Sequence, residues 1–356
     1  MDSQELARIE SGIEVHLQRL PLMTYEKGSL HLVHEGNHLV WRCGISGAFG
    51  KLGYSDMAIR MIHPGHYRAG EWLSAKREWT LLDANALRET GLAPAPLAYI
   101  SGESTPPFVV MEWVDAYPLN SLGTEREQHL APVANAIARF CKMGLTPEKF
   151  SFVPCVSGWR AEGNMTRYRR LLDMCRRRPR SYTAVWAARI FPVVARVHYE
   201  LGKYRLLFKS EPWRLHHDGL HAGNVFIRKT DSSVVFLDFD NLSFRQNRVY
   251  TLARFAASLY PNGGIPRDVF SNLMRDFCAE FASADSLRLN IMAKCVLLER
   301  LCADLVYVPW DFVRNPANKG KRISDGMEGS LYSRLEGVRE VLQWVRQLPV
   351  NPRDLL

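Results

Sequence analysis

Hydrophobic positions change their period along the first third of the chain. Apolar residues of segment 3–20 recur at helical spacing, and those that follow alternate on both sides of a turn at 35–37, which predicts a leading helix and then a β-hairpin. Helical spacing returns in 72–90 and ends at Gly91, a common helix C-cap. Three more apolar segments are expected to be strands: 56–62, 97–100 and 108–113. These elements predict a small antiparallel sheet with one helix against it.

Helical periodicity dominates the chain after residue 115. Six segments carry it: 127–142, 164–177, 182–202, 266–282, 286–306 and 330–347. A strand-rich break at Leu215–Asn241 interrupts them. The pattern predicts an α+β protein with two lobes, a sheet-containing lobe over 1–115 whose first 25 residues form a leading helix, and a larger, mainly helical lobe over 116–356.

The composition is that of a globular protein. Apolar residues make up 47% and charged residues 23% of the 356 residues, which is enough for a sizeable core. The seven cysteines are odd in number and contain no Cys-x-x-Cys pair, which favours reduced thiols in the cytoplasm. The first residues are acidic where a signal peptide needs a basic start, and the apolar stretches 184–201 and 291–313 are interrupted by charges. We therefore expect a cytoplasmic protein.

Positive charge is concentrated in the segment Arg167–Arg180. The chain has a net charge of +9, and this segment contains seven arginines. Such a cluster attracts phosphates, anionic lipid headgroups or nucleic acid, but a solvated helix face gives the same pattern. No zinc-finger, RNA-binding-motif or basic-zipper signature accompanies it, so nucleic acid is not an expected partner. Peripheral contact with the inner face of a membrane stays open.

The strand-rich break contains the residues with the clearest chemistry. Asp218 is followed by Asn224 at the start of an apolar strand, and Asp238 stands at the end of the next strand, beyond a turn at 229–233. Phosphoryl transfer needs a carboxylate that orients the attacking hydroxyl, and an amide oxygen plus a carboxylate that hold magnesium against the phosphates. A β-hairpin places the last two side by side, so this order of residues suits phosphoryl transfer.

This segment resembles the catalytic and metal-binding motifs of the aminoglycoside phosphotransferase and choline kinase group, which has a protein-kinase-like fold. The group's pattern is His-Gly-Asp-Leu-His-x-x-Asn followed by an Asp at a strand end. The run Asp238-Phe239-Asp240 is also similar to the lipopolysaccharide-core sugar kinases. The resemblance implies an ATP-dependent kinase in which Asn224 and Asp238 bind Mg²⁺ and Asp218 is the catalytic base.

The resemblance also assigns residues in the first third of the chain. Arg60 stands mid-strand where the group has a basic residue that contacts nucleotide phosphates, and Glu78 stands where the group has the acid that pairs with it. The other implied nucleotide contacts lie in a hinge that meets the adenine and in a turn that covers the nucleotide: Met111, Glu112 and Trp113, and Gly36 and Asn37.

The chain departs from the group's pattern at the base. The group has its base five positions before the Asn, whereas Asp218 lies six positions before Asn224. We favour the interpretation that Gly219 is an inserted residue, whose tolerance of a left-handed or bulged backbone lets Asp218 reach the base position. In the alternative, Gly219 replaces the base and the protein is a catalytically weak pseudokinase that regulates by binding nucleotide. A second departure is Thr251, where the group has an Asp.

Other candidate sites are less favoured by their patterns. The glycine-rich run 44–53 fails the Walker pattern and lies between two strands, so it is either a lid or a long hairpin connection. His216, His217 and His221 lack further ligands that would complete a zinc set. A protein kinase is the least favoured kinase class, because no Asp-Phe-Gly or Ala-Pro-Glu segment is present.

The acceptor is constrained only by charge. Aminoglycosides are polycations and call for a pocket rich in carboxylates, whereas this chain is basic. The sequence therefore favours a neutral or anionic small-molecule or saccharide acceptor, such as a sugar, a phosphorylated saccharide or a lipid-linked glycan.

Overall fold

The computed structural model describes most of the chain. The described residues are 2–20, 24–36, 38–46, 55–63, 73–102, 105–156, 161–177, 181–208, 211–260, 264–281, 286–315, 318, 321 and 323–348. The chain divides into two compact units: Met1–Pro118 with Asn224–Asn241, and Leu119–Gly223 with Leu242–Leu356. The chain leaves the first unit close to residue 115, and the hairpin of the strand-rich break belongs to that first unit.

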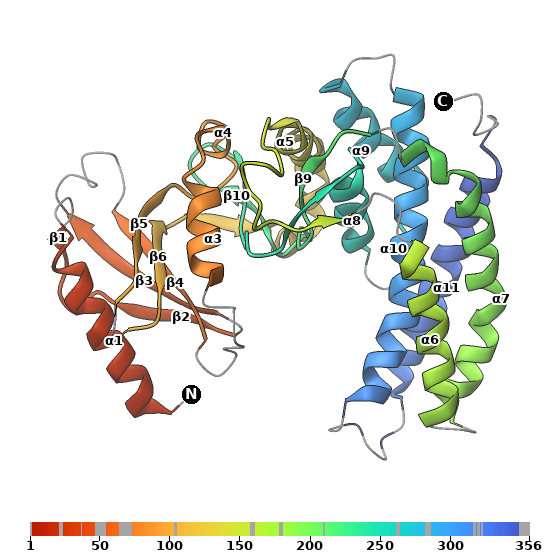
Figure 1. Ribbon diagram of the computed structural model, residues 1–356, viewed down its shortest axis with the longest axis horizontal. Coiled ribbons are helices and arrows are strands. Elements are labelled where there is room, and N and C mark those ends of the chain that lie inside the picture. The colour runs from red at the N-terminus through yellow and green to blue at the C-terminus, as the bar shows by residue number, and fades with distance from the viewer. Residues whose placement is uncertain are drawn as a thin grey trace. The chain divides into compact units, whose positions relative to one another are not determined.

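The first unit is built on a six-stranded antiparallel sheet (Figure 1). Its strands are β1 (Thr24–Tyr25), β2 (His31–Glu35), β3 (His38–Ser46), β4 (Asp56–Ile62), β5 (Pro96–Ile100) and β6 (Phe108–Glu112). They run in the order β1-β3-β4-β6-β5, and β2 pairs with β3. The strands predicted from alternation are confirmed. Most of the glycine-rich run 44–53 lies outside the described residues, as does Asn37 of the predicted nucleotide-covering turn.

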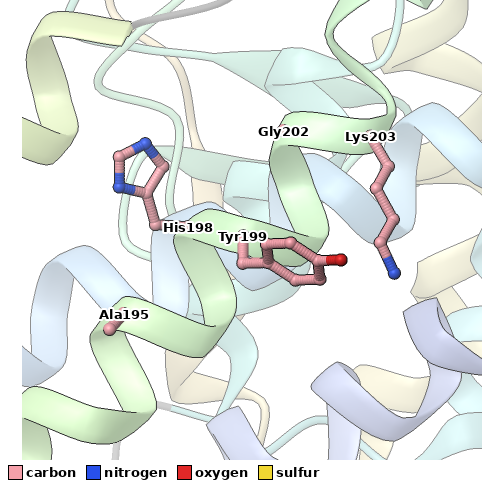
Figure 2. Close-up of a pocket in the computed structure, with 5 residues that line it drawn as sticks. All are labelled: Ala195, His198, Tyr199, Gly202 and Lys203. Carbon is pink, nitrogen blue, oxygen red and sulfur yellow. The ribbon is translucent and has the colours of Figure 1, made fainter.

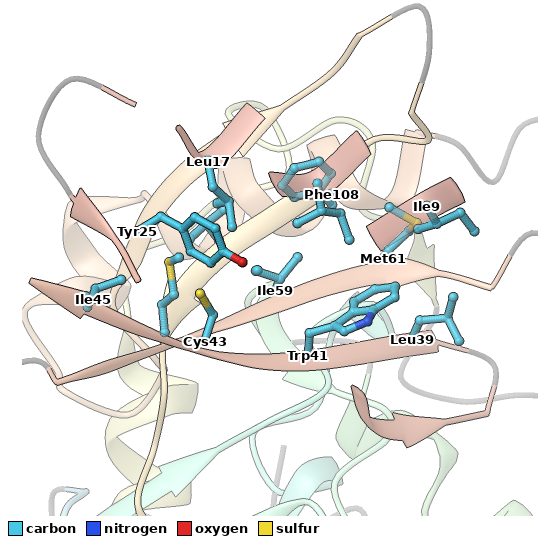
Figure 3. Close-up of a cluster of buried hydrophobic side chains, with 13 residues drawn as sticks. Ile9, Leu17, Tyr25, Leu39, Trp41, Cys43, Ile45, Ile59, Met61 and Phe108 are labelled. Atoms are coloured by element: carbon cyan, nitrogen blue, oxygen red, sulfur yellow. The ribbon is translucent and has the colours of Figure 1, made fainter. Parts of the chain in front are cut away.

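One face of this sheet packs against α1 (Ser3–Leu17), and Figure 3 shows the resulting core. Asp2 caps the helix by accepting a hydrogen bond from the Glu5 backbone N–H at 2.7 Å. The helix and three neighbouring strands bury apolar side chains against one another: Ile9, Ile13, Leu17, Leu39, Trp41, Ile59, Met61 and Phe108. Because side chains alternate along a strand, burial of Ile59 and Met61 on this face directs Arg60 to the opposite face.

The single helix predicted over 72–90 is wrong. Two helices occupy it, α3 (Leu73–Leu82) and α4 (Asn85–Arg88), because Ala84 adopts an extended conformation with φ −64° and ψ 123°. In one continuous helix Leu82 and Leu87 would face different directions. The break turns both side chains into the interior, where they are 1% and 0% exposed. Gly91, at φ +65°, confirms the predicted end of the helical region.

A second, three-stranded sheet completes the first unit. Its strands are β7 (Ala116–Pro118), β10 (Val225–Arg228) and β11 (Val234–Phe236), in the order β11-β10-β7. The β10–β11 pair is antiparallel, with Val225 opposite Phe236. The predicted hairpin of the strand-rich break is thus confirmed.

The second unit is mainly helical. Its helices are α5 (Leu130–Lys142), α6 (Ala161–Arg177), α7 (Tyr182–Lys203), α8 (Tyr250–Leu259), α9 (Arg267–Ala279), α10 (Ser286–Arg314) and α11 (Asp325–Arg346), with 3₁₀ turns η2 (Leu119–Ser121), η3 (Gly123–His129) and η4 (Arg205–Phe208). A small sheet joins β8 (Cys155–Val156), β12 (Leu242–Arg245) and β9 (Arg214–His217). The long α10 packs on α6, α7, α8 and α11. Within the described residues, no helix has the length and apolar character needed to cross a membrane.

Candidate nucleotide-binding and catalytic residues

Arg60 forms the centre of a charged cluster in the first unit. It lies in the middle of β4, on the sheet face opposite α1, and its guanidinium pairs with the carboxylate of Glu78 from α3. Its Nη2 also donates to Asp238 Oδ1 at 2.6 Å. The Arg60 and Glu78 side chains are only 11% and 5% exposed. Burial alone would lower the pKa of Arg60, but the surrounding carboxylates, with Glu78 foremost, outweigh it and raise that pKa, so Arg60 stays charged.

The β10–β11 hairpin brings the two predicted metal ligands together. Asn224 directly precedes β10 and Asp238 follows β11, and the Leu237 backbone N–H donates to the Asn224 carbonyl at 3.0 Å. Asn224 Nδ2 lies 3.4 Å from Asp238 Oδ2. Asp238 has a φ of +68°, a left-handed conformation that is rare for a residue with a side chain and recurs at functional sites.

Two residues that the sequence analysis did not assign join this cluster. His38, at the start of β3, lies 3.4 Å from Asp240 Oδ2 through Nε2 and 3.2 Å from Arg60 Nη2 through Nδ1. Asp240 Oδ2 in turn lies 3.7 Å from Arg60 Nη2. Burial raises the pKa of Asp240 to about 7, with Arg60 opposing the rise and the negative charges of Asp238 and Glu78 adding to it.

The carboxylate and amide oxygens of the cluster fit a hard divalent cation. Ligand atoms of His38, Asp238 and Asp240 all lie within 4.8 Å of one another. The Asn224 amide oxygen and the carboxylates are the oxygen ligands that Mg²⁺ prefers. In the structure the positive charge between these carboxylates is supplied by Arg60.

The predicted hinge lies at the end of β6. Met111 pairs with Ala58 of β4 and Pro96 of β5. The Glu112 carboxylate has partners within the first unit. It pairs with the Arg228 guanidinium and accepts a hydrogen bond from the Ala95 N–H at 3.1 Å. The Glu112 N–H donates to the Ala95 carbonyl at 2.8 Å. The side chain of Glu112 therefore ties the hinge to β10.

Two further predicted nucleotide contacts have partners in the same unit. The Trp113 N–H lies 3.4 Å from the Asp56 carbonyl, and its indole ring lies 5.2 Å from the Arg42 guanidinium carbon. Gly36 lies in the turn between β2 and β3, where its N–H donates to the His38 carbonyl at 3.0 Å. This hydrogen bond ties Gly36, after β2, to the first residue of β3.

Asp218, the predicted base, lies in the second unit directly after β9. Both of its carboxylate oxygens are engaged by residues of β12: Arg245 donates through Nε at 3.1 Å and Nη2 at 2.7 Å, and Ser243 donates at 2.8 Å. Burial by itself would raise the pKa of Asp218, but the hydrogen bonds and charge of Arg245 outweigh it and hold that pKa below its ordinary value. Arg245 is 3% exposed and lies against the Tyr250 ring, 3.7 Å from its centroid.

Gly219 does not adopt the backbone that the insertion argument invoked. The described glycines with positive φ are Gly28, Gly91 and Gly123. Gly219 instead lies with Asp218 in a tight turn after β9, and the β9–β12 pairing runs from 214 to 217 without a bulge. The left-handed backbone expected for Gly219 is therefore not found, and the interpretation of Gly219 as an inserted residue stays a prediction.

Thr251 anchors the start of the loop that contains Asp218. It is fully buried at the first turn of α8, and its hydroxyl bonds His216 Nδ1 at 2.8 Å and accepts from the His217 N–H at 3.3 Å. Burial lowers the pKa of His216 to about 3, so its ring is neutral. The Thr251 backbone N–H donates to His216 Nδ1 at 3.3 Å, so this nitrogen is an acceptor and the Thr251 hydroxyl donates to it as well. The Thr251 hydroxyl thus links α8 to β9. Thr251 stands at the position where the group has an Asp.

Replacing Thr251 by valine should lower the free energy of unfolding by about 2 kcal/mol, because the buried His217 N–H loses its acceptor and His216 Nδ1 loses one of its donors while the side-chain shape is kept. Chemical denaturation followed by circular dichroism measures it. Thr251→Ser keeps the hydroxyl and should lose much less. Equal losses in the two variants would show that the methyl group, not the hydroxyl, matters.

Comparisons with known proteins agree with this architecture. Residues 56–265, more than half of the chain, match the phosphotransferase enzyme family. The chain belongs to that family. No curated protein sequence gives a significant match.

Solved structures share the fold at low sequence identity. A choline kinase from Cryptosporidium parvum has a TM-score of 0.61 and 9% identity, over 97% of this chain and 98% of that one. An aminoglycoside phosphotransferase from Alicyclobacillus acidocaldarius has a TM-score of 0.58 and 16% identity, over 91% and 93%. A spectinomycin phosphotransferase in complex with ADP and spectinomycin has a TM-score of 0.53 and 11% identity, over 98% and 99%. The predicted protein-kinase-like α+β fold is therefore confirmed, and the similarity to lipopolysaccharide-core sugar kinases stays a prediction.

Proposed function

We propose that this phosphotransferase uses ATP and Mg²⁺ to phosphorylate a hydroxyl group of a small-molecule or saccharide acceptor in the cytoplasm. The observation that carries the proposal is the grouping of Arg60, Glu78, Asn224 and Asp238 in the first unit. One basic group for phosphates, an acid that orients it, and an amide and a carboxylate for magnesium are the parts that phosphoryl transfer requires.

Each residue of the cluster has a distinct role in the proposal. Asn224 and Asp238 hold Mg²⁺, which neutralises charge on the β- and γ-phosphates when bound. Arg60, which Glu78 holds in position, would contact the phosphates of the nucleotide. Asp218 serves as the base that accepts the acceptor's hydroxyl proton. The hinge 111–113 receives the adenine, and the turn at Gly36 and Asn37 covers the nucleotide.

The acceptor is proposed to be neutral or anionic. The structural neighbours include proteins named for choline and spectinomycin, so the fold accommodates chemically different acceptors. The net charge of +9 disfavours a polycation. A sugar or a phosphorylated saccharide fits this constraint.

The test is phosphotransfer to a panel of acceptors. The purified protein is incubated with ATP and Mg²⁺ and with sugars, phosphorylated saccharides, amino alcohols and aminoglycosides, and mass spectrometry detects acceptors that gain one phosphoryl group. We expect products among the neutral and anionic acceptors, and none when EDTA removes Mg²⁺. Transfer only to aminoglycosides would overturn the acceptor class, and transfer without a divalent cation would overturn the metal role.

A second candidate function is a nucleotide-binding regulator with little catalysis. The observation in its favour is that Arg245 and Ser243 engage both carboxylate oxygens of Asp218. Saturable binding of Mg-ATP by calorimetry, with no product across the whole panel, would support this function over the kinase.

Replacing Glu78 by glutamine should raise the KM for ATP roughly tenfold, because the buried Arg60 loses the charged partner that positions it. Steady-state kinetics on the best acceptor measures the change. Glu336→Gln is the matched control, since Glu336 pairs with Arg339 at an exposed position of α11. An unchanged KM in the Glu78 variant would remove Glu78 from the nucleotide site.

A further inference from the structure

The positive charge of the chain is concentrated in one helical hairpin of the second unit, formed by α6 and α7. Residues 161–203, from the start of α6 to the end of α7, contain ten Lys or Arg and three Asp or Glu, a net charge of +7. The whole chain has a net charge of +9, so most of its excess positive charge lies in this hairpin. Both helices pack on α10.

Not every arginine of the segment Arg167–Arg180 reaches the surface. Arg167 is 3% exposed and pairs with Glu299 of α10. Arg170 lies over the rings of Tyr307 and Trp310. Arg178 and Arg180 lie outside the described residues. Arg167 therefore cannot be part of the attachment surface that the sequence placed over Arg167–Arg180. Further exposed cations of the hairpin lie along α7.

A stripe of alternating apolar and basic residues runs along the exposed side of α7. Its members follow one another at spacings of three or four residues and all are exposed: Val185, Arg189, Pro192, Arg196, Tyr199 and Lys203. We call this set the α7 stripe. Val185 and Tyr199 are 63% and 62% exposed, among the most exposed large apolar side chains of the described chain. On the neighbouring α6, exposed Arg169, Leu172 and Arg176 repeat the same basic–apolar–basic spacing.

A hollow of about 620 Å³ lies beside the stripe (Figure 2). Ala195 and Gly202, two turns apart, leave room because their side chains are small. The rings of His198 and Tyr199 and the Lys203 amine complete its lining. Burial and the charge of Arg167 lower the pKa of His198, so the ring is neutral near pH 7. The hollow is therefore mostly uncharged, with a cation at one end.

The cations around this hollow share one buried carboxylate. Glu200 is 2% exposed, and Arg196, Lys203 and Arg346 all approach it. Arg196 and Lys203 also lie over the Tyr199 ring, at 5.4 Å and 4.9 Å from its centroid. Three cations and one acid leave a local excess of positive charge that Glu200 holds in place at the surface.

We propose that the exposed side of α6 and α7 docks on a bilayer surface that contains anionic phospholipids. Helices that combine Lys and Arg with exposed aliphatic and aromatic side chains bind in the interface between headgroups and acyl chains. Cations at this surface gain from anionic lipids, and residues such as Val185 and Tyr199 are removed from water there. A nucleic acid would attract the cations equally but would leave Val185, Pro192 and Leu172 without an apolar partner. The apolar members of the surface thus favour the bilayer.

Vesicle co-sedimentation of the full chain, without nucleotide, tests the inference. We expect binding to vesicles of phosphatidylcholine with phosphatidylglycerol, little binding to phosphatidylcholine alone, and weakening as salt is raised. Each basic residue near an anionic surface contributes about 1 kcal/mol, so Arg189→Gln with Lys203→Gln should weaken partitioning roughly 30-fold. Val185→Ser should weaken it about fivefold.

Matched variants elsewhere in the second unit serve as controls. Arg275→Gln with Arg339→Gln removes two cations whose side chains are 69% and 48% exposed, and Leu287→Ser removes an apolar side chain that is 49% exposed. Both should bind vesicles like the wild type. The inference is overturned if the wild type ignores anionic vesicles, if the controls lose as much as the stripe variants, or if an oligonucleotide binds where vesicles do not. Because the assay contains no ATP, its result is independent of whether the protein transfers phosphate.

Discussion

Replacing Asp238 by asparagine should lower kcat for phosphotransfer about 10³-fold, a loss typical of removing a group that stabilises charge in the transition state. Asparagine has the same shape but lacks the negative charge that holds a divalent cation beside Asn224. Arg60 keeps Glu78 and Asp240 as partners, so the cluster should persist without Asp238's charge. Steady-state turnover of ATP with the best acceptor measures the loss.

The same hairpin offers a matched control for this variant. Asp231 lies in the β10–β11 turn, where its exposed carboxylate accepts from the Ser233 N–H at 2.9 Å. Asp231→Asn keeps an acceptor there and should leave kcat unchanged. Thermal unfolding of both variants should resemble that of the wild type, because the Asp238 side chain is 33% exposed. Full activity in Asp238→Asn would remove Asp238 from the metal site and with it the central element of the proposed function.

Local periodicity was sufficient to predict most elements but not their breaks. The apolar segment 56–62 was predicted as a strand, and β4 has the same bounds. The break between α3 and α4 lies at Ala84, a good helix former, so helix propensity does not predict it. The extended conformation of Ala84 accompanies the burial of Leu87, which depends on tertiary packing. The order of the strands in the sheet could not be predicted from local pattern either. β4 lies between β3 and β6, and the pairing of β4 with β6 joins segments that are far apart in the sequence.

The same distinction applies to the candidate site. Asn224 and Asp238 are neighbours in one hairpin, so their proximity could be predicted from the turn between them. Arg60 meets Asp238 across 178 residues, and only the resemblance to known kinases connected them. His38 and Arg245 carry no sequence signal of their own, because each acquires its partner through long-range pairing. Asp240 did have a signal, the second acid of Asp-Phe-Asp, which could have been assigned to the cluster.

The loop that contains Asp218 is where sequence and structure support different roles. The sequence favours Asp218 as the base, and the structure gives it a buried ion pair with Arg245. A catalytic carboxylate can keep such a partner, provided that one lone pair still reaches the acceptor hydroxyl. Variants that remove the Asp218–Arg245 ion pair with and without its buried cation distinguish the role of Asp218 as a base from its role as the partner of Arg245.

Asp218→Asn should therefore lower both stability and activity. The free energy of unfolding should fall by about 3 kcal/mol, because Arg245 is left buried without its charged partner. If Asp218 is the base, kcat should fall about 10²-fold or more. Denaturation and steady-state kinetics measure the two losses on the same preparation.

The double variant Asp218→Asn with Arg245→Gln decides between the roles. Removal of the buried cation should restore much of the stability, as expected for coupled residues in a double-mutant cycle. We expect kcat to stay low, because the base is still missing; recovery of kcat would mean that Asp218 serves only to position Arg245. The pH dependence gives a second readout. The pKa of Asp218 is lowered in the folded protein, so the stability it contributes is present above its unfolded pKa and lost as pH falls through the folded value. The double variant should lack this acid-sensitive component of stability.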